Sequence, residues 1–466
     1  MEKQRSRVFT IASDAPFLDI LAREIFRGFP TGSPARDLAG LTILVPTRRS
    51  ARELQFKLLE MSAQRALVLP AIRPIGDIDE DVLEIGATDA QLPNAISPIG
   101  RQFALMGFIG EWLTQNPQLR LAEEIANSPQ QTLALALSLG ELIDTLETDE
   151  VSLDRLQEAY LIDLANHREA ILGLLDLVRK KLPAMLHAEN LMGGRERRSR
   201  LIRLQAQRLR ESPPKGPIIA AGSTGTIPAT RELLKAISQL ENGAVVLPGL
   251  DQELDDESWN HVSPQHPQFA LKQLLEDFGI GRTEVSVLGP AAGNRSWVAT
   301  ELMRPSATAD KWLTTLSSQQ QRMREALKHL ALIKGRDKNE EAAIIALVMR
   351  RELEKAQGDI ALVTPDRDLA RRVKAALLRW NIRVDDSAGE PLIRFGAAAL
   401  LAFLIDVVSN DFSAPSLGVL FAHPLSKFGM ERHAFQRIAG NIDLVLFRDN
   451  PIGPGLKGFA HAFERV

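Results

Sequence analysis

Two stretches far apart in the chain repeat one pattern, and this repeat constrains the fold more than any other feature. Residues 41–60 read LTILVPTRRSARELQFKLLE, and residues 359–380 read DIALVTPDRDLARRVKAALLRW. Each begins with an apolar run, continues through a turn that carries Pro and Arg, and ends in an amphipathic helix. A continuous Ile/Leu/Val run before a helix is typical of a parallel strand covered on both faces. The repeat therefore predicts an α/β fold with two related strand–helix units.

The two turns carry hydroxyl and guanidinium groups where the strands are expected to end. Open α/β sheets bind ligands at the carboxyl ends of their strands, and helix N-termini there favour anions. Either turn alone is also explained as an ordinary solvated turn. Two such edges in one chain fit an extended anion, such as a nucleic acid strand, better than a small molecule. The candidate contacts are Thr47, Arg48, Arg49, Thr364 and Arg367.

The totals describe an ordinary globular protein that needs local patches to bind nucleic acid. Its 466 residues are too many for one core and predict several domains. With 56 basic and 59 acidic residues the net charge is −3, so any DNA contact must come from clustered cations. The absence of cysteine excludes disulfides and thiolate metal sites from this chain. No stretch approaches 18 apolar residues, and we expect a cytoplasmic protein without membrane contact.

The signatures of a nucleotide site are missing. The loop ASDAPF (residues 12–17) follows a first strand predicted at 7–12, yet it lacks the glycines and the lysine of a phosphate cradle. The glycine pair of GSTGT (residues 222–226) also lacks a lysine. Asp251 follows an apolar strand as a magnesium-binding acid would, but without a phosphate loop a structural or surface role is the better interpretation. We expect no catalytic residue, no cofactor and no metal in this chain.

Residues 97–210 are predicted to be a helical insertion that interrupts the sheet. Its last helix is crowded with arginines, which only Glu196 opposes within the run. Such a run is usually a solvated face, and it is also suited to contact phosphates. The arginines are Arg195, Arg197, Arg198, Arg200, Arg203, Arg208 and Arg210, and the first five are carried forward as candidate DNA contacts.

A second domain is expected to begin near residue 329 and to contain three strands, at 329–334, 359–364 and 382–384. Three strands are fewer than the roughly five or six of an average sheet, and the chain then turns helical. We therefore predict a fragment of a longer protein. The expected domains are a discontinuous first α/β domain (1–96 and 211–328), a helical insertion (97–210), the start of a second α/β domain (329–391) and a second, truncated helical insertion (392–466).

Several runs resemble one known family over essentially the whole chain. These are ILVPTRRSAREL, LPAIRPIGDIDED, AAGSTGTIPATRELL, VVLPGLDQELDDESW, ALVTPDRDLARRV and VDDSAGEPL, and they are similar to the AddB subunits of alphaproteobacterial AddAB helicase-nucleases. The resemblance implies two RecA-like domains of superfamily 1 helicase type with helical insertions. It also implies double-strand break repair at DNA ends beside the ATP-driven partner AddA, and reading of the recombination hotspot Chi.

Carried onto this chain, the resemblance places ASDAPF where a motor has its phosphate loop and AAGSTGTIP where a motor has its Asp-Glu pair, both degenerate. Thr47, Arg48 and Arg49 fall on one DNA-strand-binding motif, and Thr364, Asp366 and Arg367 fall on its counterpart. Family members also carry a C-terminal nuclease domain, often with an iron-sulfur cluster held by cysteines, which we do not expect here.

Three hypotheses follow. The first is a non-catalytic scaffold that holds or scans single-stranded DNA beside AddA. The second is an active ATP-dependent helicase with an unorthodox nucleotide site at GSTGT and Asp251. The third is an assembly surface for AddA that leaves the DNA contacts to its partner.

Overall fold

A computed structural model describes residues 7–31, 38–62, 68–75, 92–117, 128–152, 168–355, 359–448, 453 and 455–464. The chain divides into two compact units, residues 1–330 and residues 331–466. The four acids Asp77, Asp79, Glu80 and Asp81 lack the spacing of a calcium loop and predict a solvated acidic turn. They lie outside the described residues. None of the helices in the described ranges combines the length and the hydropathy that a membrane crossing needs.

The first unit is built on a six-stranded parallel sheet, which confirms the predicted α/β class. Every strand pair is parallel, so all carboxyl ends meet at one edge. The order along the sheet is β3 (Ala71–Pro74), β2 (Thr42–Val45), β6 (Ile218–Ala221), β7 (Gly243–Pro248), β1 (Val8–Ile11) and β8 (Ser286–Val287).

The apolar run ALVLP at residues 66–70 predicts a strand, but the strand that the structure describes in this part of the chain is β3, which begins at Ala71. Its first ladder bond runs from the N–H of Ala71 to the carbonyl of Leu41, at 3.0 Å. Pro70 has no N–H to donate, so the ladder begins after it.

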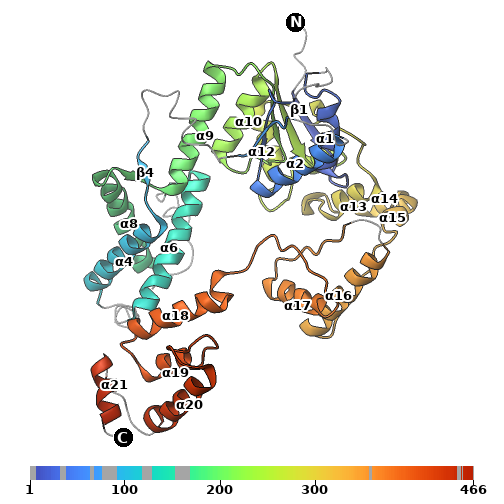
Figure 1. Cartoon of the computed structure of the whole chain (residues 1–466). Helices are drawn as coiled ribbons and strands as arrows, with labels where there is room; N and C mark the ends of the chain where they lie inside the picture. Colours follow the sequence, from blue (N-terminus) through green and yellow to red (C-terminus); the bar gives the residue numbers. More distant parts are fainter. Residues whose placement is uncertain are drawn as a thin grey trace. The chain divides into compact units, whose positions relative to one another are not determined.

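Helices cover both faces of the sheet, which explains why its central strands read as continuous apolar runs. One face packs against α1 (Phe17–Phe26) and α2 (Arg48–Met61). The opposite face packs against α9 (Gly194–Glu211), α10 (Pro228–Gln239) and α12 (Phe269–Phe278). Figure 1 shows α1 and α2 in blue on one side of the strands and the green helices on the other.

The described parts of residues 97–210 are mainly helical, as predicted. Helices α4 (Pro98–Gln115), α6 (Pro129–Asp149) and α8 (Arg168–Ala188) pack around a core of their own that includes Leu105 and Val178. Two short strands, β4 (Asn94–Ala95) and β5 (Leu191–Met192), pair beside them in parallel. After the sheet come α11 (Asp256–Asn260), α13 (Asn294–Leu302), α14 (Lys311–Ser318) and α15 (Gln320–Ala326).

The second unit contains no strand among the residues that the structure describes, so the predicted second parallel sheet is not seen. It consists of helices: α16 (Lys338–Glu354), α17 (Arg367–Leu378), α18 (Gly396–Ser409), α19 (Ala414–Ala422), α20 (Arg432–Ile442) and α21 (Gly455–Glu464).

The predicted strands of this unit lack cover on one side. Leu362 and Ile382 pack on the α16–α17 pair. In contrast, Leu332 and Val363 are 85% and 93% exposed. A buried parallel strand needs cover on both faces, and these segments form no ladder with other described residues.

Candidate nucleic-acid interface

The carboxyl edge of the sheet has two positions where adjacent strands lead to helices on opposite faces. One lies between β1 and β7, which lead to α1 and α12, and the other lies between β2 and β6, which lead to α2 and α10. Such switch points are where open α/β sheets bind ligands. The two positions are therefore the natural candidates for a site, and they differ sharply in chemistry.

At the β1–β7 switch point, the loop after β1 is bound to the start of α13. The Asp14 carboxylate accepts a 2.9 Å hydrogen bond from the N–H of Gly293, at the start of α13. A Cβ on Gly293 would lie 2.5 Å from that carboxylate oxygen, so a larger residue there would have to displace the Asp14 side chain. Ser13 Oγ lies 2.9 Å from Ser296 Oγ. The β1 loop is thus held to the start of α13, while α1, the helix that follows this loop, has Pro16 as its N-cap and no side-chain cap.

Asp251, the candidate magnesium acid, is engaged within the protein. Its Oδ1 accepts hydrogen bonds from the N–H groups of Glu253 and Leu254, each at 2.9 Å. Its Oδ2 accepts from Thr300 Oγ1 at 2.7 Å. These bonds fix the turn after β7, as expected of a structural acid. The described residues contain no group of three metal-binding side chains.

The β2–β6 switch point is basic. Thr47 caps α2: its side-chain oxygen accepts from the N–H of Ser50 at 3.0 Å. Arg48 and Arg49 follow it, all three residues are exposed, and the first turn of α2 contains no acid. The positive end of the helix dipole and two guanidinium groups therefore coincide at one strand end.

The β6 loop adds hydroxyl groups and a helix start to the same region. Gly222 has a φ of +81°, and its Cβ position lies 3.4 Å from Pro46, so the β2 and β6 loops are in contact. The hydroxyls of Thr224 and Thr226 lie 2.9 Å apart. Helix α10 begins without a side-chain cap or a first-turn acid. The nearby Arg231 is held by Asp277 at 2.8 Å.

The counterpart turn in the second unit is built differently. Thr364 Oγ1 accepts from the N–H of Asp366, and Asp366 caps α17. Arg367 donates to both carboxylate oxygens of Asp386, at 3.1 and 2.7 Å, and to the carbonyl of Gly389. Hydrogen bonding to Arg367 lowers the pKa of Asp386. Arg367 is half exposed, so a phosphate would compete with this carboxylate.

Two arginines of α9 donate hydrogen bonds to backbone carbonyls. Arg197 Nε donates to the carbonyl of Pro93 at 3.0 Å, and Arg198 donates to the carbonyl of Ile75 at 3.1 Å. These bonds tie α9 to the chain segments at both ends of residues 76–91.

Other α9 arginines pair with acids that lie far away in the sequence. Arg203 bonds to Glu150, at the end of α6, and to Glu232 of α10 at 3.2 Å. Hydrogen bonding to Glu150 raises the pKa of Arg203. Arg200 pairs with Glu196 one turn before it, at 2.5 Å. The count of local acids along the sequence missed Glu150 and Glu232.

The N-terminus of α9 is held by α6. The Glu147 carboxylate accepts from the N–H of Glu196 at 3.3 Å, and it lies where a Cβ on Gly193 would be. Burial raises the pKa of Glu147. Arg195 is 4.0 Å from Asp144 and half exposed. The structure thus gives all five α9 candidates a contact inside the protein, and Thr47, Arg48 and Arg49 are exposed residues at the sheet edge.

Comparison with known proteins gives no independent assignment. Neither the protein-family models nor the curated proteins contain a match to this chain.

Proposed function

We propose that this chain is the helicase-like, non-catalytic part of an AddB-type subunit, which holds single-stranded DNA beside an AddA-type partner. The observation that carries this proposal is the contrast between the two switch points. At the β1–β7 position, the β1 loop lacks the glycines and the lysine of a phosphate cradle, and Asp14 ties this loop to Gly293. The neighbouring position presents Thr47, Arg48 and Arg49 at an acid-free helix start.

We further propose that the sheet of the first unit is a RecA-like core and that residues 359–378 are the related element of a second one. The support is the parallel sheet with helices on both faces. In both repeats, an extended segment leads through a capped turn into an Arg-rich helix. Chi recognition, action on double-stranded DNA ends and a cytoplasmic location belong to the same proposal, on the strength of the resemblance alone.

The test is single-stranded DNA binding by the purified chain. Phosphate contacts release counterions, so affinity falls steeply with salt. Replacing Arg48, Arg49 and Arg367 with Ala removes three such contacts. The slope of log affinity against log salt should then become shallower by about 2, from about 0.7 per contact on single strands.

A matched control removes the same charge elsewhere. Arg336, Arg350 and Arg351 lie in or before α16 and pair with neighbouring glutamates. Their triple Ala variant should keep the wild-type slope. Equal slopes for the two triple variants would show that general charge, not the strand-end edge, binds DNA.

A further inference from the structure

The outward face of α2 carries a row of exposed side chains spaced four residues apart: Arg48, Arg52 and Phe56. Residues four apart on a helix are surface neighbours. The row spans about 12 Å, from eight residues at about 1.5 Å each. It starts at the strand end that holds Thr47 and runs away from it along the helix.

Phe56 does not belong to the hydrophobic core of the first unit. Ala51, Leu54 and Leu58 form the buried stripe of α2. Phe56 is 63% exposed. Its ring is therefore open to a ligand on the surface.

The charge around Phe56 favours an anionic ligand at one end of the row. Arg52 forms no hydrogen bond or ion pair with any residue of the described ranges. The exposed residues at 48–53 are three arginines, Arg48, Arg49 and Arg52, and one acid, Glu53. Beyond Phe56, Glu60 lies 3.9 Å from Lys57, so the positive field is confined to the first two turns.

We infer that Phe56 is a base-stacking residue for single-stranded DNA. A nucleobase stacks on its ring, while Arg52 and Arg48 contact the phosphates toward the sheet edge. Cations along the backbone path with an aromatic platform beside them are the usual means of holding a single strand. The inference rests on the proposed function, which it extends by one residue and one contact type.

The experiment measures the affinity of an oligothymidine of about 16 nucleotides, within the range of known single-strand sites. Phe56→Ala should weaken binding by about 5- to 150-fold, the range that base–aromatic stacking covers. Phe56→Leu, which keeps apolar surface but has no ring, should weaken binding similarly. Phe56→Trp, which keeps an aromatic ring, should bind as tightly as wild type. The salt slope should not change, because Phe carries no charge.

The chain offers a matched control in Phe103 of α4, which is 68% exposed. Phe103→Ala should leave the affinity unchanged, and a fully paired duplex should bind Phe56→Ala and wild type equally. Normal binding by Phe56→Ala and Phe56→Leu overturns the inference and leaves the proposed function intact. An equal loss on duplex also overturns it. Absence of binding by the wild-type chain overturns the proposed function itself.

Discussion

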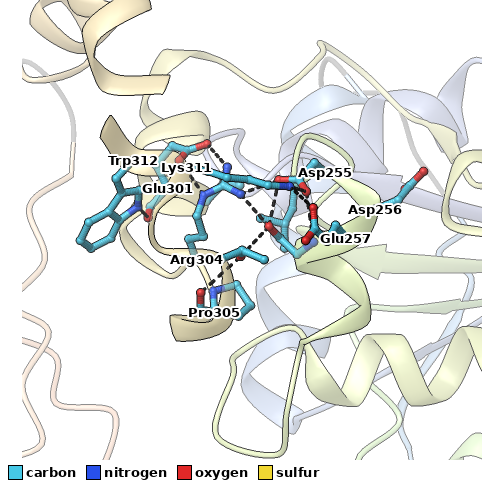
Figure 2. A network of polar contacts seen from close by, with 12 residues as sticks. Asp255, Asp256, Glu257, Glu301, Arg304, Pro305, Lys311 and Trp312 are labelled. Carbon is cyan, nitrogen blue, oxygen red and sulfur yellow. Dashed lines mark hydrogen bonds and ion pairs between the residues drawn. The ribbon is translucent and has the colours of Figure 1, made fainter. Parts of the chain in front are cut away.

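Replacing Arg304 with Met should cost the first unit a large part of its stability. Arg304 lies just after α13, its side chain is 4% exposed, and it joins two carboxylates. It bonds to Glu301 at 2.7 and 3.0 Å, to Ser258 at 2.6 Å and to Asp255. Figure 2 shows Arg304, Glu301, Asp255 and Lys311 close together. The network holds the end of α13 in place, and the start of α13 contacts the β1 loop through Gly293.

The magnitude follows from the burial of the partners. Glu301 is 6% exposed, so without Arg304 its charge stays buried and uncompensated. Removing one partner of a buried pair costs about 3–5 kcal/mol, out of a typical total of about 5–15 kcal/mol. Although burial opposes ionisation of Asp255, hydrogen bonds from Lys311 and Arg304 hold its pKa well below the usual range.

The assay is urea unfolding followed by tryptophan fluorescence, since Trp259, Trp297 and Trp312 belong to this region. The control is Asp256→Asn: Arg282 reaches Asp256 at 2.8 Å, but that carboxylate is 93% exposed, and exposed pairs contribute little. The double variant of Arg304→Met with Glu301→Gln should cost less than the sum, by about 0.5–3 kcal/mol. If Arg304→Met unfolds at the same urea concentration as Asp256→Asn, the network does not hold this segment.

Three further predictions concern the contacts around the sheet edge and α9. Gly293→Ala should lower stability because its Cβ meets the Asp14 carboxylate at 2.5 Å, and Asp14→Ala in the same chain should suppress that loss in thermal unfolding. Asp144 is bonded by Arg101 at 2.6 and 3.0 Å, which lowers its pKa. Its stabilisation is therefore present above the unfolded pKa of about 3.9 and lost as pH falls through the folded value. Asp144→Asn should thus be less stable than wild type at pH 7, with the gap closing in acid. Thr47→Ala should cost about 1 kcal/mol in urea unfolding as a lost helix cap, and an undiminished stability would contradict the cap.

The sequence was sufficient for the elements whose burial is uniform along the chain. β2 and β7 read as continuous apolar runs because helices cover both faces of their sheet. The extended segment at 359–364 has the same composition, yet Val363 stays exposed. An apolar composition makes a segment suitable for a buried strand. The neighbouring strands that hydrogen-bond to it and the helices that cover it come from other parts of the chain.

In the candidate site, too, local features could be predicted from the sequence and contacts between distant residues could not. The exposure of Arg48 and Arg49 follows from their place at a strand end, which local pattern reveals. The contacts of Asp14 with Gly293 and of Arg203 with Glu150 join residues 279 and 53 positions apart. No local signal marks such pairs. The sequence therefore showed that the β1 loop lacks the glycines of a phosphate loop, but not that Asp14 of this loop bonds to Gly293.

The most direct measurement of the central claim is binding of single-stranded DNA by this chain alone, across a salt series, with and without Mg-ATP. The account predicts binding that weakens steeply with salt, does not respond to ATP, and is accompanied by no ATP hydrolysis. DNA-stimulated hydrolysis that is lost in Asp251→Ala would contradict it and establish the active-helicase alternative. Absence of binding at low salt would contradict it in favour of an assembly surface for the partner.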